Sequence, residues 1–181
     1  MNKPSASELE KAIETILKYI GENPKREGLK DTPKRVRKFY DEWFLSKEEI
    51  NSTLFSEKYS NMVIIKNIPF YSFCEHHMLP FIGQMSIGYL PNGKVLGLSK
   101  LIRIVKKHTK KLQIQERIGK QIADDIEKAT HVRGVMVVIE AEHLCMSMRG
   151  VESPGHNTIT SEIRGLFKKI EVRTEFLQLI K

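Results

Sequence analysis

Residues 134–149 read GVMVVIEAEHLCMSMR and form the most regular stretch of the chain. Successive side chains of a β-strand point to opposite faces of its sheet. One face of a strand here would carry Val135, Val137, Ile139, Ala141, His143, Cys145, Ser147 and Arg149. The first half of this face is apolar, as a face that covers a core must be, and the second half is polar. We therefore predict a strand over residues 134–149 that begins in the core and ends in the wall of a site.

The rest of the chain predicts further elements around this strand. Apolar residues recur at helical spacing in 5–22, after Asp31, in 99–111 and from about Gln113, and a closing helix is expected over 174–180. Strands are expected over 62–68, 81–90, 94–98 and 158–167, with a hairpin turn at Pro91-Asn92-Gly93. The order predicts an α+β domain over 61–181, with an antiparallel sheet and two helices on one face. An N-terminal helical extension, residues 1–60, precedes it.

The overall composition restricts the class of protein. The chain has 181 residues, 40% of them hydrophobic and 29% charged, which is typical of a globular protein. Its start lacks the apolar segment of a signal peptide, and no apolar run is long enough for a membrane span. Two cysteines without an export signal favour a reducing compartment. We expect a cytoplasmic protein that does not associate with membranes.

A net charge of +8 favours an anionic partner. Nucleic acid fits less well than a phosphorylated metabolite, because the aromatic residues around Trp43 fall at core spacing and are not interleaved with basic residues. We expect no nucleic-acid partner.

Both cysteines of the chain lie close to histidines, in Cys74-Glu-His-His77 and in His143-Leu-Cys145. A single cysteine or histidine is usually an ordinary buried residue. Two such clusters together favour a metal site instead. Cys74, His77 and Cys145 would fill three positions of a tetrahedral zinc ion and leave the fourth open for water, as in catalytic zinc sites. His108, His131 and His156 are assigned no role.

Two further histidines lie beside the predicted ligands. His143 and Cys145 are roughly 6.5–7 Å apart along a strand, so His143 can act on a substrate without binding the metal. His76 is adjacent to His77, and neighbouring side chains tend to point in different directions. One histidine of this pair can therefore bind metal while the other faces the substrate.

A basic segment starts at the predicted helix over 99–111. Ser99, Lys100 and Arg103 lie in its first turn, where unpaired backbone N–H groups attract phosphate. Arg149, on the predicted strand face that holds Cys145, would add a third cation. The later lysines of this helix fit a solvated surface. Arg35 and Lys38 in the N-terminal region join this site only if their helix approaches it, which the sequence does not specify.

The chain resembles the GTP cyclohydrolase I family over nearly its whole length. The match depends on an ordered set of motifs: Thr32-Pro-Lys-Arg35, Cys74-Glu-His-His77, Gly97-Leu-Ser-Lys100, Gln113-Ile-Gln-Glu-Arg117, His143-Leu-Cys145 and Met148-Arg-Gly150. Each motif alone is weak, and the ordered set is specific. The resemblance implies the tunnelling fold and a homodecamer with active sites at subunit interfaces.

The resemblance also implies the reaction, which converts GTP and water to 7,8-dihydroneopterin triphosphate and formate, the first step of pterin and folate biosynthesis. One Zn²⁺ per subunit would be bound by Cys74, His77 and Cys145, and Gln115 and Glu116 would bind the guanine. The triphosphate would be bound by Lys100, Arg103, Arg149, Arg35 and Lys38, the last two from a neighbouring subunit.

Three residues receive catalytic roles from the resemblance. His143 would protonate N7 of the guanine, His76 would assist opening of the ribose ring, and Ser99 would help the later rearrangement. Two alternatives remain open. One is a non-catalytic nucleotide-binding module in which His76 or His143 completes a structural zinc site. The other is a different tunnelling-fold enzyme that acts on a pterin or a deazaguanine.

Overall fold

The computed structural model describes residues 3–46, 54–57 and 59–181. The chain divides into two compact units, Met1–Lys47 and Glu48–Lys181, and each is described here by itself. The boundary predicted at residue 60 stays a prediction.

The N-terminal unit consists of two packed helices, α1 (Ala6–Tyr19) and α2 (Thr32–Phe44). Ser5 and Glu8 form a reciprocal capping box at the start of α1, which satisfies backbone N–H groups that the helix leaves unpaired. Pro33 lies in the first turn of α2, where its missing N–H costs no hydrogen bond. Both helices were predicted, and Arg37 of α2 forms an ion pair with Glu10 of α1 at 2.7 Å.

The second unit is built on a five-stranded sheet with the order β5-β2-β3-β6-β7. These strands are β2 (Val63–Cys74), β3 (Pro80–Leu90), β5 (Leu112–Gln113), β6 (Gly134–His143) and β7 (Asn157–Gly165). The four long strands pair antiparallel, and the two-residue β5 pairs parallel with the end of β2. The sheet is therefore mixed, where the sequence predicted a purely antiparallel one.

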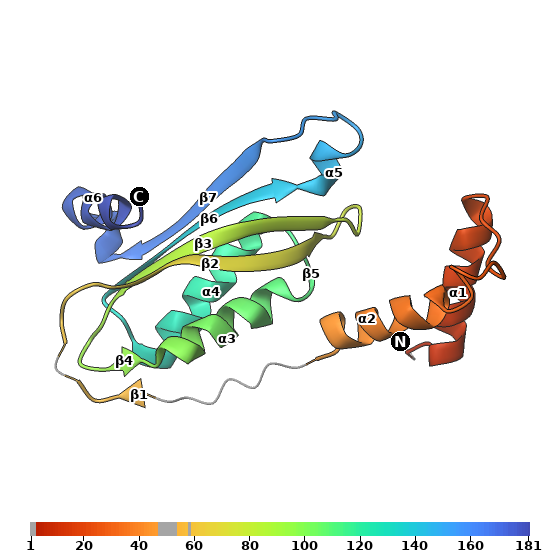
Figure 1. Cartoon of the computed structure of the whole chain (residues 1–181). Helices are drawn as coiled ribbons and strands as arrows, with labels where there is room; N and C mark the ends of the chain where they lie inside the picture. Colours follow the sequence, from red (N-terminus) through yellow and green to blue (C-terminus); the bar gives the residue numbers. More distant parts are fainter. Residues whose placement is uncertain (1–2, 47–53, 58) are drawn as a thin grey trace. The chain divides into compact units, whose positions relative to one another are not determined.

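Two helices, α3 (Leu98–Thr109) and α4 (Gln115–Thr130), lie against the same face of this sheet (Figure 1). Ile118, Ile122 and Ile126 of α4 are spaced one turn apart and are fully buried. They pack with Leu101 and Ile104 of α3 and with the apolar face of the strands. Burial of this apolar surface is the main stabilising contribution to the fold, and the α+β class is confirmed.

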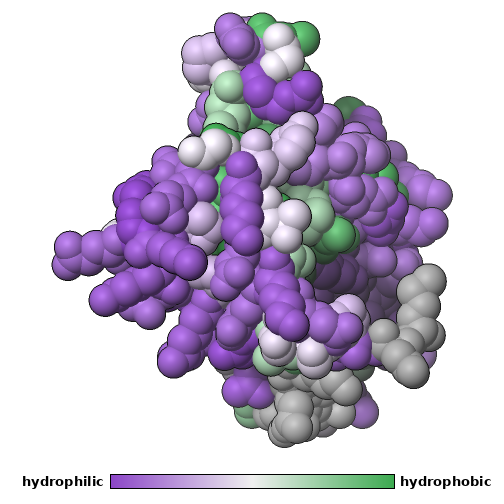
Figure 2. Space-filling model, turned by 90° about the vertical axis from the view of Figure 1, so that its right-hand side faces the viewer, coloured by the Kyte–Doolittle hydropathy of each residue, from purple (hydrophilic) through white to green (hydrophobic). Residues whose placement is uncertain are grey.

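A smaller apolar cluster includes the C-terminal part of the chain. The 3₁₀-helix η1 (Leu166–Lys168) and helix α6 (Ile170–Leu179) supply Phe167 and Phe176, which pack edge to face at 5.7 Å. The predicted closing helix therefore exists, but it begins four residues earlier than expected. None of the described helices is both long and apolar enough to cross a membrane. The face shown in Figure 2 is mostly hydrophilic, with hydrophobic residues in small groups.

The hairpin predicted at Pro91-Asn92-Gly93 is wrong. Strand β4 (Val95–Leu96) pairs with β1 (Leu54–Phe55) in a separate two-stranded sheet, and β3 pairs with β2 and β6 instead. The backbone N–H of Leu96 donates to the buried Tyr89 hydroxyl at 3.0 Å. Because β3 already has a partner on each side, the chain after the turn has no free strand edge to return to.

The strand predicted over residues 134–149 is too long. Strand β6 ends at His143, and residues Leu144–Ser147 form a short helix, α5. The reason is that both partner strands end there, since the last pairs are His143 with Phe81 of β3 and Glu142 with Asn157 of β7. The predicted alternation of Cys145, Ser147 and Arg149 on one strand face is therefore wrong.

Candidate metal centre and active site

Two cysteines and one histidine converge at one end of the sheet. One ligand atom each from Cys74, His77 and Cys145 lies within 4.8 Å of the other two. Cys74 is the last residue of β2, His77 lies in the turn to β3, and Cys145 lies in α5. Three side chains from three different segments thus form a group that can bind a metal ion.

The turn between β2 and β3 fixes two of these three groups. The N–H groups of His77 and Met78 both donate to the carbonyl of Cys74, at 3.4 and 2.8 Å, and the N–H of Cys74 donates to the carbonyl of Leu79 at 2.8 Å. This compact turn brings Nδ1 of His77 to 3.7 Å from the sulfur of Cys74. His76 has the same distance from its Nδ1 to that sulfur, so it also lies at the metal group.

Cys145 is positioned by hydrogen bonds around α5. The Ser147 hydroxyl donates to the Glu142 carboxylate at 2.7 Å, which joins the end of α5 to the end of β6. Burial raises the pKa of the Cys145 thiol, and the neighbouring Cys74 adds to this effect, while the Arg149 guanidinium acts in the opposite direction. A bound cation would also favour the thiolate. Arg149 is thus electrostatically linked to Cys145, although not through strand alternation.

His143 is held against both the sheet and α4. Its ring stacks on Phe81 with centroids 4.6 Å apart and an interplanar angle of 5°. Its Nε2 lies 2.8 Å from Oε1 of Gln115. Burial lowers the pKa of His143, while the Glu116 carboxylate acts in the opposite direction. An imidazole that is neutral near pH 7 is suited to proton transfer.

These residues line one cavity of about 290 Å³. Its wall contains the three possible metal ligands, His76 and His143, together with Glu116 from the first turn of α4. The remaining lining residues are Gln113, Ile114, Gln115, Met146 and Thr158. The geometry therefore brings together seven of the residues that the sequence singled out, since Gln115 is one of them, and Glu116 is exposed among them.

Gln115 lines this cavity, but its side chain is engaged within the protein. The residue is 2% exposed, and its amide nitrogen donates to three acceptors in β6 and β7. The predicted hydrogen bond from this side chain to a guanine would compete with those contacts, and it stays a prediction.

The residues of α3 that are predicted to bind phosphate do not line the cavity with the possible metal ligands. Ser99, Lys100 and Arg103 are in the first half of α3, whereas β5, next to Cys74, follows the end of that helix. From Ser99 to Thr109 the helix spans about 15 Å. Lys100 is 5% exposed and lines a separate cavity of about 190 Å³ with Lys107, Lys128 and Asp125. Burial lowers the pKa of Lys100, and the Asp125 carboxylate acts in the opposite direction.

The remaining predicted residues lie in the N-terminal unit. Arg35 and Lys38 are exposed on α2, and Arg35 lies 3.5 Å from Asp31, the residue just before this helix. That unit also contains a larger cavity, of about 620 Å³, between α1 and α2. Its described lining contains neither cysteine nor histidine, so cavity size does not identify the reactive site.

Sequence reasoning assigned no role to four supporting residues of the site. Phe81 stacks on His143, and Arg117 forms an ion pair with Glu75 at 2.6 Å, which joins the turn between β2 and β3 to α4. Gln113 accepts a backbone hydrogen bond from Glu75 at 3.1 Å. The sequence shows Glu75 beside Cys74 and Arg117 two residues after Gln115. It does not show that they pair, because the pairing depends on how α4 packs on the sheet.

Comparison with known proteins matches nearly the whole chain to one family. The family model described as GTP cyclohydrolase I matches residues 9–181. Two relatives named GTP cyclohydrolase 1, from Pelotomaculum thermopropionicum and Aquifex aeolicus, are each 52% identical, and each alignment covers 96% of this chain and 95% of the relative. A third, from Streptococcus agalactiae, is 51% identical and covers 98% of both chains.

A solved structure supports the fold independently. The crystal structure of the archaeosine synthase QueF-Like in the apo form is similar with a TM-score of 0.51. The likeness covers 60% of this chain and 97% of that chain, at 17% sequence identity. At this identity it supports the fold alone.

Proposed function

The chain belongs to the GTP cyclohydrolase I family, and from this premise we infer that it is the enzyme that converts GTP and water to 7,8-dihydroneopterin triphosphate and formate. This reaction is the first step of pterin and folate biosynthesis. The observation that supports the assignment most strongly is the convergence of two thiols, three histidines and Glu116 on one cavity of the chain.

We propose zinc as the metal, with Cys74, His77 and Cys145 as its ligands. Two sulfur donors and one imidazole nitrogen within 4.8 Å of one another are a donor set that zinc prefers. A zinc ion with one open position would supply a water molecule that ionises near neutral pH. Both cysteines are free thiols, as ligands must be, and this agrees with a cytoplasmic location.

Two residues of α4 and β6 would act on the guanine. The Glu116 carboxylate would accept hydrogen bonds from the ring N–H and the exocyclic amine, because it is exposed at the cavity and has two acceptor oxygens. His143 would accept a proton from the attacking water and pass it to N7 while the water oxygen adds to C8. The imidazole ring of guanine then opens to a formamide, whose hydrolysis releases formate.

The later steps would involve His76 at the cavity together with residues of α3 and of the N-terminal unit. His76 would assist opening of the ribose ring, and it lies beside the metal ligands without being required among them. Ser99 would help the rearrangement that precedes closure of the pterin ring. We propose that Lys100, Arg103, Arg149, Arg35 and Lys38 bind the triphosphate.

The position of α3 supports an active site shared between subunits. Ser99, Lys100 and Arg103 are separated from the metal group of the same chain by most of the length of α3. A triphosphate bound beside that metal group would therefore meet Lys100 and Arg103 of a neighbouring copy. This agrees with the tunnelling fold and the homodecamer that the family resemblance implies, with Arg35 and Lys38 also contributed by a neighbouring subunit.

Product analysis tests this function directly. The zinc-loaded protein is incubated with GTP, and formate and dihydropterin absorbance are followed together. We expect equimolar formation of both products. A nucleotide-binding module would release neither, and an enzyme for another pterin or a deazaguanine would leave GTP unchanged. Removal of the metal should abolish turnover, and added zinc should restore it.

A further inference from the structure

Gln115 connects His143 to the two strands beside it. It is the first residue of α4, and its amide nitrogen lies 3.1 Å from the carbonyl oxygen of Ile139 and 2.9 Å from that of Thr158. The Thr160 hydroxyl is a third neighbour at 3.1 Å. On its other side, the amide oxygen lies 2.8 Å from Nε2 of His143.

These neighbours determine which way the amide of Gln115 is oriented. Backbone carbonyl oxygens can only accept hydrogen bonds, so the atom that faces Ile139 and Thr158 must be the NH₂ group. The amide oxygen therefore faces His143, and this oxygen can only accept. A hydrogen bond between them requires a proton on Nε2 of His143. In the neutral ring, the other nitrogen, Nδ1, is then unprotonated.

The ring of His143 is also fixed in orientation. Phe81 stacks on it almost in parallel, which disfavours rotation of the ring out of this plane. No described residue donates to or accepts from Nδ1. One nitrogen is therefore used for positioning, and the other remains for a substrate in the cavity that His143 lines.

We propose that Gln115 is a positioning residue that holds His143 as the Nε2–H tautomer and leaves Nδ1 as the nitrogen that meets the substrate. This inference rests on the proposed role of His143 in proton transfer. It differs from the guanine contact that the family resemblance implies for Gln115, because the amide acts on the histidine and not on the base. A residue of this kind affects the chemical step more than the binding of GTP.

The tautomer can be measured without any turnover. Zinc-loaded protein with ¹³C,¹⁵N-labelled histidine is studied by solid-state NMR, and the His143 signals are identified by their absence in His143→Ala. We expect an Nε2–H tautomer in the native protein and a mixture or an Nδ1–H tautomer in Gln115→Met. An Nδ1–H tautomer in the native protein would overturn the proposal, whether or not the enzyme acts on GTP.

Kinetics provide the second readout, with a matched control on the same helix. We expect Gln115→Met to lower kcat by about 10- to 100-fold and to leave the KM for GTP within about twofold. The control is Gln121→Met, because Gln121 of α4 contacts a different histidine, the buried His108, at 3.1 Å. It should keep native kcat. An increase in KM at unchanged kcat in Gln115→Met would show that Gln115 binds substrate and would overturn the proposal.

Discussion

His143 at the end of β6 and His108 in α3 each contact a glutamine of α4, and burial lowers the pKa of both. Their other nitrogens differ. Nε2 of His108 lies 2.8 Å from the Asp125 carboxylate, whereas Nδ1 of His143 has no partner among the described residues. His108 is only 6% exposed, and His143 lines the cavity with the metal group.

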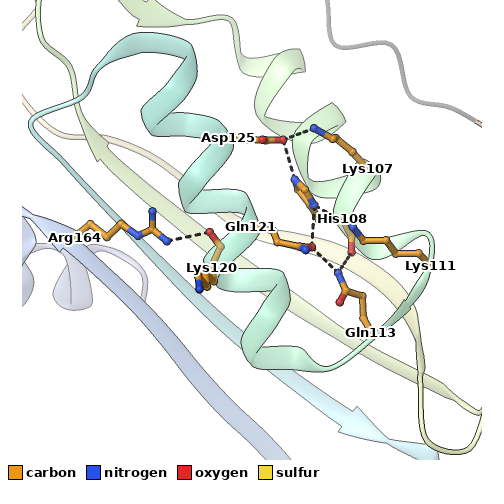
Figure 3. A network of polar contacts seen from close by, with 8 residues as sticks. All are labelled: Lys107, His108, Lys111, Gln113, Lys120, Gln121, Asp125 and Arg164. Carbon is orange, nitrogen blue, oxygen red and sulfur yellow. Dashed lines mark hydrogen bonds and ion pairs between the residues drawn. The ribbon is translucent and has the colours of Figure 1, made fainter.

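The surroundings of His108 form a closed polar network between α3 and α4 (Figure 3). Lys107 contacts the same Asp125 oxygen at 2.7 Å, and Gln113 donates to Gln121 at 2.8 Å. Burial raises the pKa of Asp125, but hydrogen bonds from Lys107 and His108 outweigh it and hold that pKa below its ordinary value. Every polar atom of the His108 ring is engaged, so this histidine is suited to stabilise the packing of two helices.

The difference suggests what would separate a structural histidine from the proton-transfer residue that we propose. Both are at least partly buried and both contact an amide, so neither burial nor a contact with glutamine identifies a functional residue. What identifies it is one nitrogen without a partner beside a cavity that also contains metal-binding groups. Substitution of each histidine in turn tests these two roles.

The largest expected effect is on catalysis, in His143→Ala. Loss of a group that transfers a proton in the transition state should lower kcat by about 10²- to 10⁴-fold. Zinc content should stay native, since His143 lies outside the group of three possible ligands. Steady-state kinetics and metal analysis of the same preparation measure both. Full turnover in this variant would show that His143 does not transfer a proton in the reaction.

The next effect is on stability, in His108→Leu. This change leaves the partly buried Asp125 carboxylate and Gln121 without the imidazole that they contact, and we expect a loss of about 1–3 kcal/mol in the free energy of unfolding. Turnover per folded molecule should remain near native. Urea unfolding at fixed protein and zinc concentration measures the loss. A large fall in kcat with native stability would reverse the roles assigned to the two histidines.

The sequence predicted the place of His143 beside the possible metal ligands better than it predicted the residues that hold it. Two short motifs contain Cys74, His77, His143 and Cys145. These residue types rarely cluster without a metal or catalytic role, so the sequence could predict their grouping. The partnership of Gln115 with His143 was not, because it depends on how α4 packs across β6 and β7. A glutamine in the first turn of a helix carries no local signal of such a contact.

The limits of the fold prediction have the same physical origin. Helix spacing located α3 and α4, and alternation located β6, since these patterns are local. The end of β6 at His143 is set by where β3 and β7 end, and the pairing of β4 with β1 is set by the lack of a free edge on β3. Both depend on other segments of the chain. The network around His108 likewise joins residues of two helices and β5.

A smaller effect is expected in the pH dependence of stability. Because burial lowers the pKa of His108 in the folded protein, the unfolded chain binds more protons at and below its ordinary pKa of about 6.5. The contribution of His108 to stability should therefore be complete above this pH and decline as the pH falls from about 7 toward 5.5. Asp125 stays ionised in this range. Urea unfolding of the native protein and of His108→Gln, both saturated with zinc, isolates the effect. An equal decline in both proteins would contradict it.

The smallest effect is expected at the edge of the same network, in Lys107→Gln. The Lys107 side chain is 45% exposed, whereas the Asp125 side chain that it contacts is 19% exposed. Water and salt screen an ion pair with an exposed partner, so we expect a loss of only about 0.2–1 kcal/mol. This loss should shrink in 1 M salt, while the loss in His108→Leu should persist because that contact is buried. Unfolding of both variants at low and high salt makes the measurement. If Lys107→Gln lowered the free energy of unfolding as much as His108→Leu, surface charge would hold the network together. The buried hydrogen bonds of His108 would then not explain its structural role.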